Sequence, residues 1–228
     1  MLPRVLEPEV MDTPEEARDY DAMDHAAVNR AFCEDMLAVR PTPGRVLDVG
    51  TGTARIPIEL CSLSPNAEVV AIDLAEHMLA LARENIERAG LGSRVTVAKI
   101  DAKALPYPDG AFGVVLSNSI VHHIPEPAEV LAEMWRVTSR GGLLFVRDLY
   151  RPEAEAEIDR LVALYSGERP ADPAAALSFD HQRSLFHASL AAALTVDEIV
   201  AFVAPLGIPA SAVRMTSDRH WTLSAVKP

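Results

Sequence analysis

The stretch RVLDVGTGTA, residues 45–54, determines the fold expected of this chain. Its apolar, β-branched first half predicts a strand that is buried on both faces. Gly50 and Gly52 follow, where the lack of a Cβ permits a tight turn and the close approach of a ligand. Residues 54–63 then place apolar side chains on roughly one helical face. Pro57 fits such a helix only in its first turn, where the missing N–H would be unpaired anyway.

A strand, a glycine turn and a helix form a nucleotide-binding corner, and the residues around it indicate which nucleotide. The dinucleotide pattern Gly-x-Gly-x-x-Gly requires a third glycine where this chain has Arg55. Asp48 precedes Gly50 by two residues, and a carboxylate there would repel phosphate oxygens but suit a cation. S-adenosylmethionine carries an ammonium and a sulfonium group and no phosphate. The stretch therefore favours a methyl donor over a dinucleotide.

The segment VLDVGTGTARIPIEL resembles the first motif of the class I S-adenosylmethionine-dependent methyltransferases. That family has an acid, then Gly-x-Gly with a small residue or glycine two places on; the match falls on Asp48, Gly50 and Gly52, with Ala54 replacing the commoner third glycine. The resemblance covers about residues 40–226. It implies an α/β fold: a Rossmann-like, doubly wound, seven-stranded and mostly parallel sheet whose last strand is antiparallel. It also implies S-adenosylmethionine as the cofactor.

Length, charge and cysteine content narrow the class of protein. A chain of 228 residues suffices for one sizeable α/β domain with an elaboration. The net charge of −12 argues against binding to nucleic acid or to an anionic membrane. Cys33 and Cys61 are too few for a disulfide framework, and the chain shows no apolar leader or membrane-spanning run. We therefore expect a cytoplasmic enzyme with a small-molecule acceptor and no nucleic-acid or membrane partner; a homodimer is left open.

The second and third strands each end in an acid. Asp73 lies 21 residues after Gly52, where a doubly wound sheet places a carboxylate against ribose hydroxyls; the alternative is a helix N-cap. Asp101 matches the family position that accepts from the adenine amino group, with a turn residue as the alternative. By resemblance, Leu74 and Met78 pack near the adenine and the donor. The predicted donor-binding set is Asp48, Gly50, Thr51, Gly52, Asp73, Leu74, Met78, Asp101, Ala102 and Asn118.

The loop after the fourth strand, residues 118–125, should face the donor because ligands lie outside the carboxyl ends of strands. His122 and His123 lie in it, and an imidazole titrates near neutrality, so they are the predicted catalytic residues, with one acting as general base. Adjacent side chains tend to diverge, so we expect at most one to face the pocket. The alternative for each is a paired, structural histidine.

The acceptor side is predicted from three separate regions. Residues 1–43 are expected to form an N-terminal helical lid, with helices beginning near 14 and 26, and residues 44–228 the methyltransferase domain, with a helical insertion at about 153–205. The alternative for the segment around residue 20 is a solvated loop. The predicted substrate-binding residues are Tyr20, His25, Asn29, Arg147 and His187. Arg147 could equally pair with its neighbour Asp148.

The remaining expectations concern strands, metal and activity. Further strands are predicted at 68–73, 94–100, 111–117, 143–146, 212–216 and 220–226, with a turn at Gly141–Gly142. Catechol-type methyltransferases bind magnesium through acids after the fourth and fifth strands; Ser117 and Asn118 offer none, so no metal is predicted. We expect in-line methyl transfer to a small molecule. The alternatives are another enzyme that uses the same donor, and a non-catalytic donor-binding scaffold.

Overall fold

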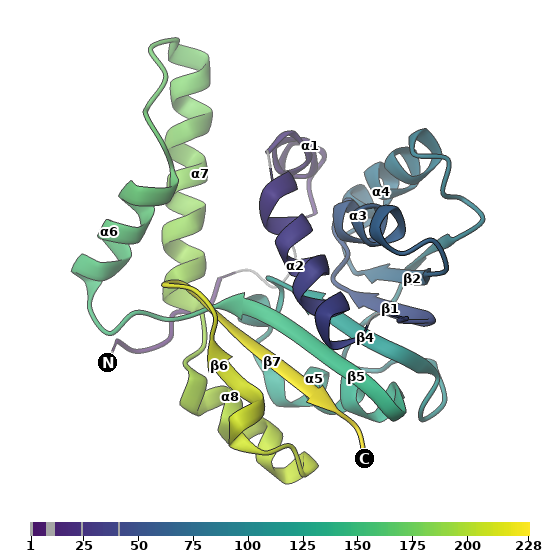
Figure 1. The fold of residues 1–228 in the computed structure, drawn as a ribbon. Helices are drawn as coiled ribbons and strands as arrows, with labels where there is room; N and C mark the ends of the chain where they lie inside the picture. Colours follow the sequence, from purple (N-terminus) through teal and green to yellow (C-terminus); the bar gives the residue numbers. More distant parts are fainter. Residues whose placement is uncertain (1, 8–11, 24, 41) are drawn as a thin grey trace.

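The computed structural model describes residues 2–7, 12–23, 25–40 and 42–228 (Figure 1). Residues 1, 8–11, 24 and 41 of the predicted N-terminal lid lie outside the described residues. The strands are β1 (Arg45–Val49), β2 (Glu68–Asp73), β3 (Val95–Lys99), β4 (Phe112–Asn118), β5 (Thr138–Leu149), β6 (Val213–Met215) and β7 (His220–Val226). The α-helices are α1 (Pro14–Ala22), α2 (Ala26–Val39), α3 (Arg55–Leu63), α4 (Glu76–Arg88), α5 (Pro127–Val137), α6 (Glu155–Tyr165), α7 (Pro173–Ala192) and α8 (Val196–Val203). Short 3₁₀ turns lie at η1 (Val121–His123), η2 (Ala204–Leu206) and η3 (Ala210–Ala212).

One seven-stranded sheet organises the chain, in the order β3-β2-β1-β4-β5-β7-β6. The strands from β1 to β5 pair in parallel, and β7 runs antiparallel to both of its neighbours. The order reverses between β1 and β4, so the carboxyl ends of these two strands open a crevice where open α/β sheets bind ligands. The predicted doubly wound sheet with an antiparallel last strand is confirmed.

Helices cover both faces of the sheet because its central strands are apolar on both faces. Val46 points to the layer that contains α2, α3 and α4, whereas its neighbour Leu47 points to the layer that contains α5 and α8. Successive side chains of a strand point to opposite faces, so each of these layers receives every second residue. The continuous apolar run that begins after Arg45 thus fills two separate cores.

Local signals mark the helix starts correctly. Helix α3 begins at Arg55, which places the buried Pro57 in its first turn, as predicted. Helix α1 begins after a capping box in which the Thr13 hydroxyl accepts from the Glu16 N–H and the Glu16 carboxylate accepts from the Thr13 N–H. Helix α8 begins with the same device at Thr195 and Glu198.

The expected turn at Gly141–Gly142 is wrong, because both glycines lie inside β5, which already begins at Thr138. The register between β4 and β5 shifts between Phe112 and Val114, so this end of the pair is irregular. A Cβ on Gly142 would lie 2.7 Å from Oγ and 2.8 Å from the carbonyl oxygen of Ser139 in the same strand, and 2.9 Å from the carbonyl oxygen of Gly113 on the neighbouring strand. Glycine is therefore needed here because β5 bulges back on itself and approaches β4 closely, although the chain does not reverse its direction.

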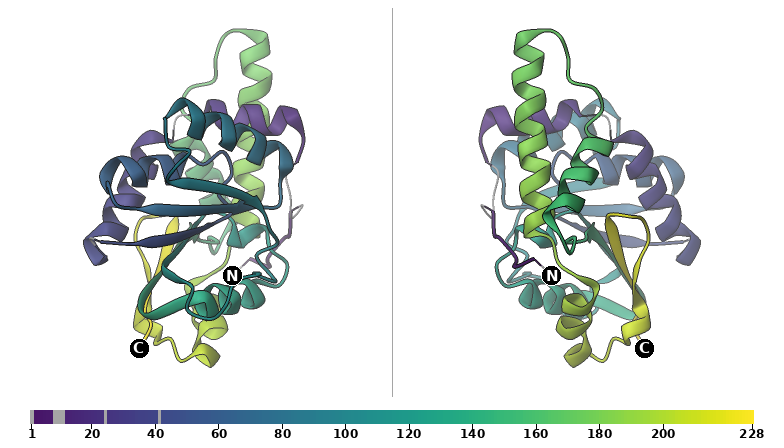
Figure 2. Two further views of the ribbon diagram at one scale, coloured as in Figure 1. Left: turned by 90° about the vertical axis from the view of Figure 1, so that its right-hand side faces the viewer. Right: turned by 90° about the vertical axis from the view of Figure 1, so that its left-hand side faces the viewer.

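Helices α6 and α7 pack together and stand away from the sheet, next to the edge where the parallel strands have their carboxyl ends (Figure 2). Their contact is built from Ile158, Leu161 and Leu190, with Leu2 of the N-terminal segment packed against it. None of the helices within the described ranges has the length and apolar character needed to cross a membrane.

Candidate active site

A pocket opens at the carboxyl ends of β1, β2, β3 and β4. It encloses about 870 Å³, counting its open mouth. Its polar lining includes Asp73, Asp101 and Asn118. Its apolar walls are Leu74, Met78, Ile100, Ile120, Ile124 and Val130.

The turn after β1 forms the floor of this pocket and requires glycine. Gly50 has φ of 75° and Gly52 has φ of 54°, both in the left-handed region that glycine adopts at no steric cost. A Cβ on Gly50 would lie only 2.2 Å from Cγ2 of Ile120. The N–H groups of Gly50 and Thr51 both donate to the Ile72 carbonyl oxygen at 2.9 Å, which ties the turn to β2. The space above Gly50 is thus taken by the loop after β4.

Asp73 links the turn to the next helix and also lines the pocket. Its Oδ2 accepts from the Gly52 N–H at 2.8 Å, and its Oδ1 accepts from the Ala75 N–H at 3.0 Å. Burial raises the pKa of Asp73, and these two hydrogen bonds oppose that shift. A carboxylate has about four lone-pair sites, so two remain for ligand hydroxyls. The backbone-capping role and a ribose-binding role are therefore compatible in one side chain.

The other predicted donor residues fall into two groups. Leu74, Met78, Asp101, Ala102 and Asn118 line the pocket together with the two glycines and Asp73. Asp48, in β1, and Thr51, within the glycine turn, are both buried and do not line it.

Asp48 is nevertheless an unusual group to find beneath a ligand pocket. Its Oδ2 is buried and accepts no hydrogen bond from any described residue. Burial raises the pKa of the Asp48 carboxyl to about 7. A buried carboxylate oxygen without a partner is rare in native proteins. A positively charged ligand in the pocket would favour the ionised form of this carboxyl.

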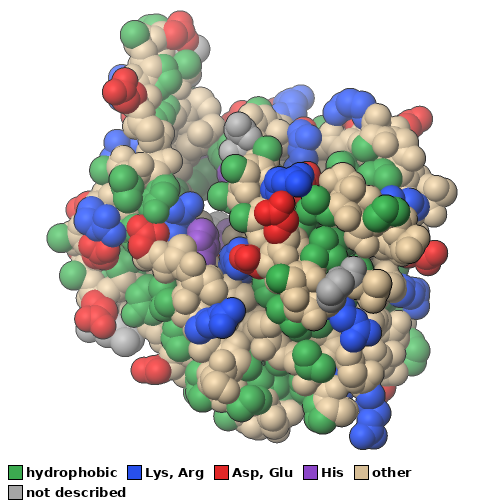
Figure 3. Space-filling view, in the orientation of Figure 1, with side chains coloured by type: hydrophobic (Ala, Val, Ile, Leu, Met, Phe, Trp, Pro, Cys, Tyr) green, Lys and Arg blue, Asp and Glu red, His purple; other side chains and the backbone are tan. Residues whose placement is uncertain are grey.

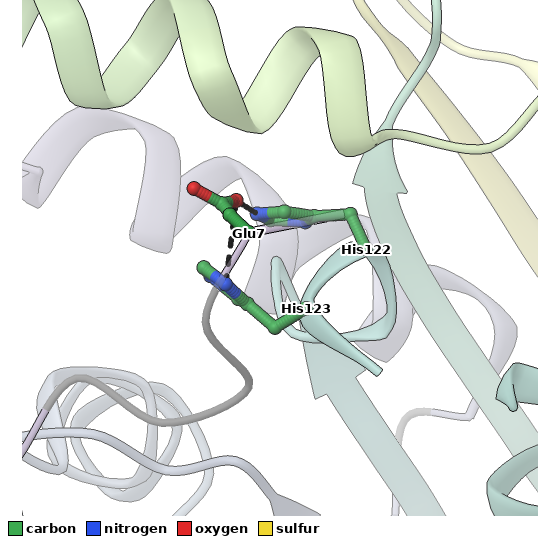
Figure 4. A group of neighbouring side chains, drawn as sticks. All are labelled: Glu7, His122 and His123. Carbon is green, nitrogen blue, oxygen red and sulfur yellow. Dashed lines mark ion pairs between the residues drawn. The ribbon is translucent and has the colours of Figure 1, made fainter. Parts of the chain in front are cut away.

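The two adjacent histidines of η1 do not diverge, yet only one of them lines the pocket, which is the number expected. Their ring centroids lie 4.1 Å apart and the rings are tilted by 37°. His123 lines the pocket, whereas His122 is buried behind it and does not. Both reach the same carboxylate, because Glu7 Oε1 lies 3.6 Å from Nε2 of His122 and 3.3 Å from Nδ1 of His123 (Figure 4). A single turn of 3₁₀ helix keeps the two rings on one side.

Behind this group, Asp148 of β5 holds His122. Nδ1 of His122 lies 2.5 Å from Oδ1 of Asp148, which is fully buried. Burial alone would lower the pKa of His122, but the charge and hydrogen bond of Asp148 and the charge of Glu7 raise it. Asp148 therefore does not pair with Arg147, which had been one of the two alternatives.

The predicted acceptor-side residues are only partly brought together. Tyr20 of α1 lines the pocket, and its ring lies 5.6 Å from that of His25. Neither His25 nor Asn29 is part of the pocket lining.

Arg147 and His187 lie elsewhere, so their prediction as pocket residues is not supported by their position. Arg147 pairs with Asp35 of α2 at 2.6 Å, because its side chain points to the opposite face of β5 from Asp148. Nε2 of His187 lies 2.9 Å from Glu155 of α6, outside the pocket lining.

The sequence did not indicate that Glu7 and Ile120 belong to the site. It also did not indicate that Asp148 is the hydrogen-bond partner of His122. Glu7 carries no local signal, since it ends a short segment, LPRVLE, with no periodicity. Asp148 offered one usable sign: it lies near the end of a strand on the ligand side of the sheet.

Figure 3 shows a hollow between the projecting α7 and the α1–α2 layer, with histidine side chains at its floor.

Comparison with known proteins agrees with this architecture. Residues 47–146 match the family described as a methyltransferase domain. The demethylmenaquinone methyltransferase of Thermus thermophilus is 40% identical over 116 residues, which are 51% of this chain and 52% of that protein. The phosphatidylethanolamine N-methyltransferase of Cereibacter sphaeroides is 40% identical over 99 residues, 43% of this chain and 47% of that protein. The chain thus spans about half the length of the curated relatives it matches.

The similarity in structure extends over nearly the whole chain. An S-adenosylmethionine-dependent methyltransferase of Aquifex aeolicus superposes with a TM-score of 0.63 at 20% identity, covering 94% of this chain and 98% of that one. At this identity the likeness shows the fold. The segment matched by the family begins in β1 and ends in β5, the same unit that builds the pocket. Residues 47–146 therefore match a methyltransferase-domain family, and the chain has the fold of the class I S-adenosylmethionine-dependent methyltransferases.

Proposed function

We propose that this chain binds S-adenosylmethionine in the pocket above the glycine turn and transfers its methyl group to a small-molecule acceptor. The observation that carries the proposal is the pocket itself: a glycine floor at the sheet's crossover, with Asp73 and Asp101 at the ends of adjacent strands. No phosphate-binding glycine follows Gly52, and the carboxylates around the pocket suit a cationic, hydroxyl-bearing ligand.

The donor would supply the reactive group, and the protein would bind and position it. S-adenosylmethionine, when bound, supplies an electrophilic methyl group on a positively charged sulfur, which leaves as a neutral thioether. Asp73 would accept from the ribose hydroxyls and Asp101 from the adenine amino group. The apolar walls would hold the adenine and exclude water, so that the acceptor and methyl group remain aligned.

His123 is the best-placed base for an acceptor that must lose a proton. It lines the pocket, and its ring is partly exposed. In this role it would take the proton from the acceptor atom as that atom attacks the methyl carbon. Tyr20 reaches the same pocket from α1, which supports the proposal that the N-terminal helices act as a lid.

The acceptor is proposed to be a small molecule because an acidic chain disfavours nucleic acid. The names of the relatives identify demethylmenaquinone, phosphatidylethanolamine and malonyl-acyl-carrier protein as their acceptors, which differ in the atom methylated. This diversity does not select one acceptor for the present chain.

The test combines donor binding with transfer. Calorimetric titration with S-adenosylhomocysteine should give one site per chain. Incubation with methyl-labelled donor and a panel of quinol, amine, carboxylate and thiol acceptors should label at least one of them. Tight donor binding without any transfer would favour a scaffold role, and donor consumption without methylation would favour another reaction on the same donor. An absence of donor binding would refute the proposal.

A further inference from the structure

We propose that Glu7, His122 and His123 form a binding site for one divalent transition-metal ion, with zinc indicated by the type and spacing of the ligand atoms. The proposal is independent of donor binding, but His123 could not act as the general base while it holds the ion. It also departs from the sequence expectation of no metal. That expectation considered only acids after the fourth and fifth strands, whereas Glu7 comes from the N-terminal segment.

The three ligand atoms are close enough for one ion. The Glu7 carboxylate oxygen and the two imidazole nitrogens all lie within 4.8 Å of one another. Zinc–ligand bonds of roughly 2.0–2.1 Å place two ligand atoms of a tetrahedral site about 3.3–3.4 Å apart. The two distances from Glu7 Oε1, 3.3 Å to His123 and 3.6 Å to His122, match that edge. The third distance is the one between the two histidine nitrogens, and a rotation of the partly exposed His123 ring would bring it to the same length.

The contact between Glu7 and His122 is the wrong length for a hydrogen bond. An N–H···O bond spans about 2.7–3.2 Å, and this pair is separated by 3.6 Å. Oε1 of Glu7 is buried and accepts no hydrogen bond from any residue that the structure describes. A buried carboxylate oxygen that faces two imidazole nitrogens at this distance leaves room for a cation among the three groups, and such a cation would pair the buried charge.

Asp148 supplies the support that a metal-binding histidine requires. It accepts from Nδ1 of His122 at 2.5 Å, which directs the lone pair of Nε2 toward Glu7. Metal-ligating histidines almost always donate their other ring N–H to a carboxylate, a carbonyl or water. The ligand set of two histidines and one glutamate leaves a fourth position for water or substrate, as in catalytic zinc sites.

The segment that carries Glu7 is held in place by its own contacts. The Arg4 guanidinium donates to the carbonyl oxygens of His122 and Ile124 at 2.9 Å and to that of Ala192 at 2.7 Å. The Val5 N–H donates to the Ala191 carbonyl oxygen at 3.1 Å. Because His123 also lines the donor pocket, an ion at this site would join the N-terminal segment to the pocket wall.

The experiment uses the full chain, freed of metal with a chelator and then titrated with Co²⁺, a coloured substitute for Zn²⁺. We expect saturation at one ion per chain and the intense visible absorption of four-coordinate cobalt, displaced by Zn²⁺. Glu7→Gln keeps the size of the side chain but removes the anionic ligand, so it should weaken binding at least tenfold. Asp148→Asn should weaken it about tenfold to a hundredfold, as other second-layer partners do.

The matched control is His187→Gln. His187 also lies near two carboxylates, 2.9 Å from Glu155 and 3.8 Å from Asp159, but at the surface and without a second histidine. This variant should bind Co²⁺ like the unmodified chain. Circular dichroism of each metal-free variant verifies that it is folded, and Zn²⁺ should raise the melting temperature of the unmodified chain but not of Glu7→Gln.

The metal site is overturned if no saturable one-to-one binding occurs, or if Glu7→Gln binds as tightly as the unmodified chain. A weak six-coordinate cobalt spectrum would overturn the assignment to zinc. Titration of the metal-free chain with S-adenosylhomocysteine keeps the two proposals apart. Donor binding that persists when Co²⁺ fails to bind refutes the metal site alone.

Discussion

Asp148 and His122 form a buried pair in which Oδ1 of the aspartate lies 2.5 Å from Nδ1 of the imidazole. The second carboxylate oxygen, Oδ2, accepts from the N–H groups of Val121 and His122 at 2.6 and 3.2 Å. One carboxylate at the end of β5 thus determines both the path of the loop after β4 and the orientation of its first histidine. The wall of the donor pocket is built on this side chain.

Replacing Asp148 with Asn should lower the free energy of unfolding by about 3–5 kcal/mol, the usual cost of breaking a buried ion pair. The amide would place N–H groups against either the backbone donors or the ring donor that the carboxylate now accepts from. Urea denaturation measures the change. The control is Asp35→Asn, because Asp35 also pairs with a cation, at 2.6 Å from Arg147, but is 59% exposed. That variant should lose about 1 kcal/mol or less, and equal losses in both would contradict the prediction.

Gly50→Ala should impair both folding stability and donor binding. Its Cβ would lie 2.2 Å from Ile120 and displace the loop that carries the histidines. Overpacking of this kind costs typically about 1–3 kcal/mol. Gly44→Ala is the control, since Gly44 has a similar φ of 68° but open space where the Cβ would lie.

The two alanine variants share the strain of a positive φ, so their difference isolates the collision with Ile120. Thermal melting and calorimetric titration with S-adenosylhomocysteine should both separate them, with donor binding reduced only for Gly50→Ala. If the two variants have the same melting temperature and the same donor affinity, the loop that carries Ile120 moves aside without affecting stability or binding.

Asp73→Asn should weaken donor binding about tenfold to a hundredfold. Hydrogen bonds to a charged group are worth roughly 1.5–3 kcal/mol, and the amide retains the shape while removing the charge. Asp109→Asn, at a side chain that is 81% exposed, should leave the dissociation constant unchanged. If Asp73→Asn binds S-adenosylhomocysteine normally, the residue serves only the backbone of Gly52 and Ala75.

The stability of the donor-free protein should depend on pH through Asp48. Burial raises the pKa of Asp48 to about 7, whereas an exposed aspartate titrates near ~3.9. The folded chain therefore retains a proton that the unfolded chain releases. The stabilisation from this group is complete below the unfolded pKa and is lost as the pH rises through the folded one.

Asp48→Asn has no titrating carboxyl at this position, so it is the reference against which the pH dependence of the unmodified chain is measured. Between about pH 4 and pH 8 the unfolding free energy of the unmodified chain should fall relative to that of Asp48→Asn by on the order of 3–4 kcal/mol, since each pKa unit corresponds to about 1.4 kcal/mol. Urea denaturation across this range gives the difference. A constant difference would show that Asp48 is already ionised in the folded chain at low pH.

The sheet was predictable because its signals are local. Apolar runs, the glycines after β1 and the acids after β2 and β3 each lie within a few residues of the feature they determine. Parallel strands then bring their carboxyl ends to one edge, so Asp73 and Asp101 could be placed without knowing any long-range contact. The turn expected at Gly141–Gly142 failed because two glycines indicate a reversal and a close strand approach equally well.

The acceptor side was not predictable to the same extent because its geometry depends on long-range contacts. Nothing near Glu7 indicates that it meets two histidines from the loop after β4. Arg147 and Asp148 are neighbours in sequence, yet strand alternation sends one to α2 and the other to His122. The distance of His187 from the pocket likewise follows from the packing of α6 against α7, which its sequence pattern does not specify.

The hydrogen bonds of Arg4 impose an order on how the chain is assembled in the cell. Their acceptors lie 118, 120 and 188 residues further along, so the segment around Arg4 is synthesised well before its partners and finds them only when most of these residues have been made. Contacts of such long range form late because the intervening chain must be ordered before they are gained. A nascent chain that still lacks α7 can therefore build the glycine turn but cannot complete the enclosure beside it.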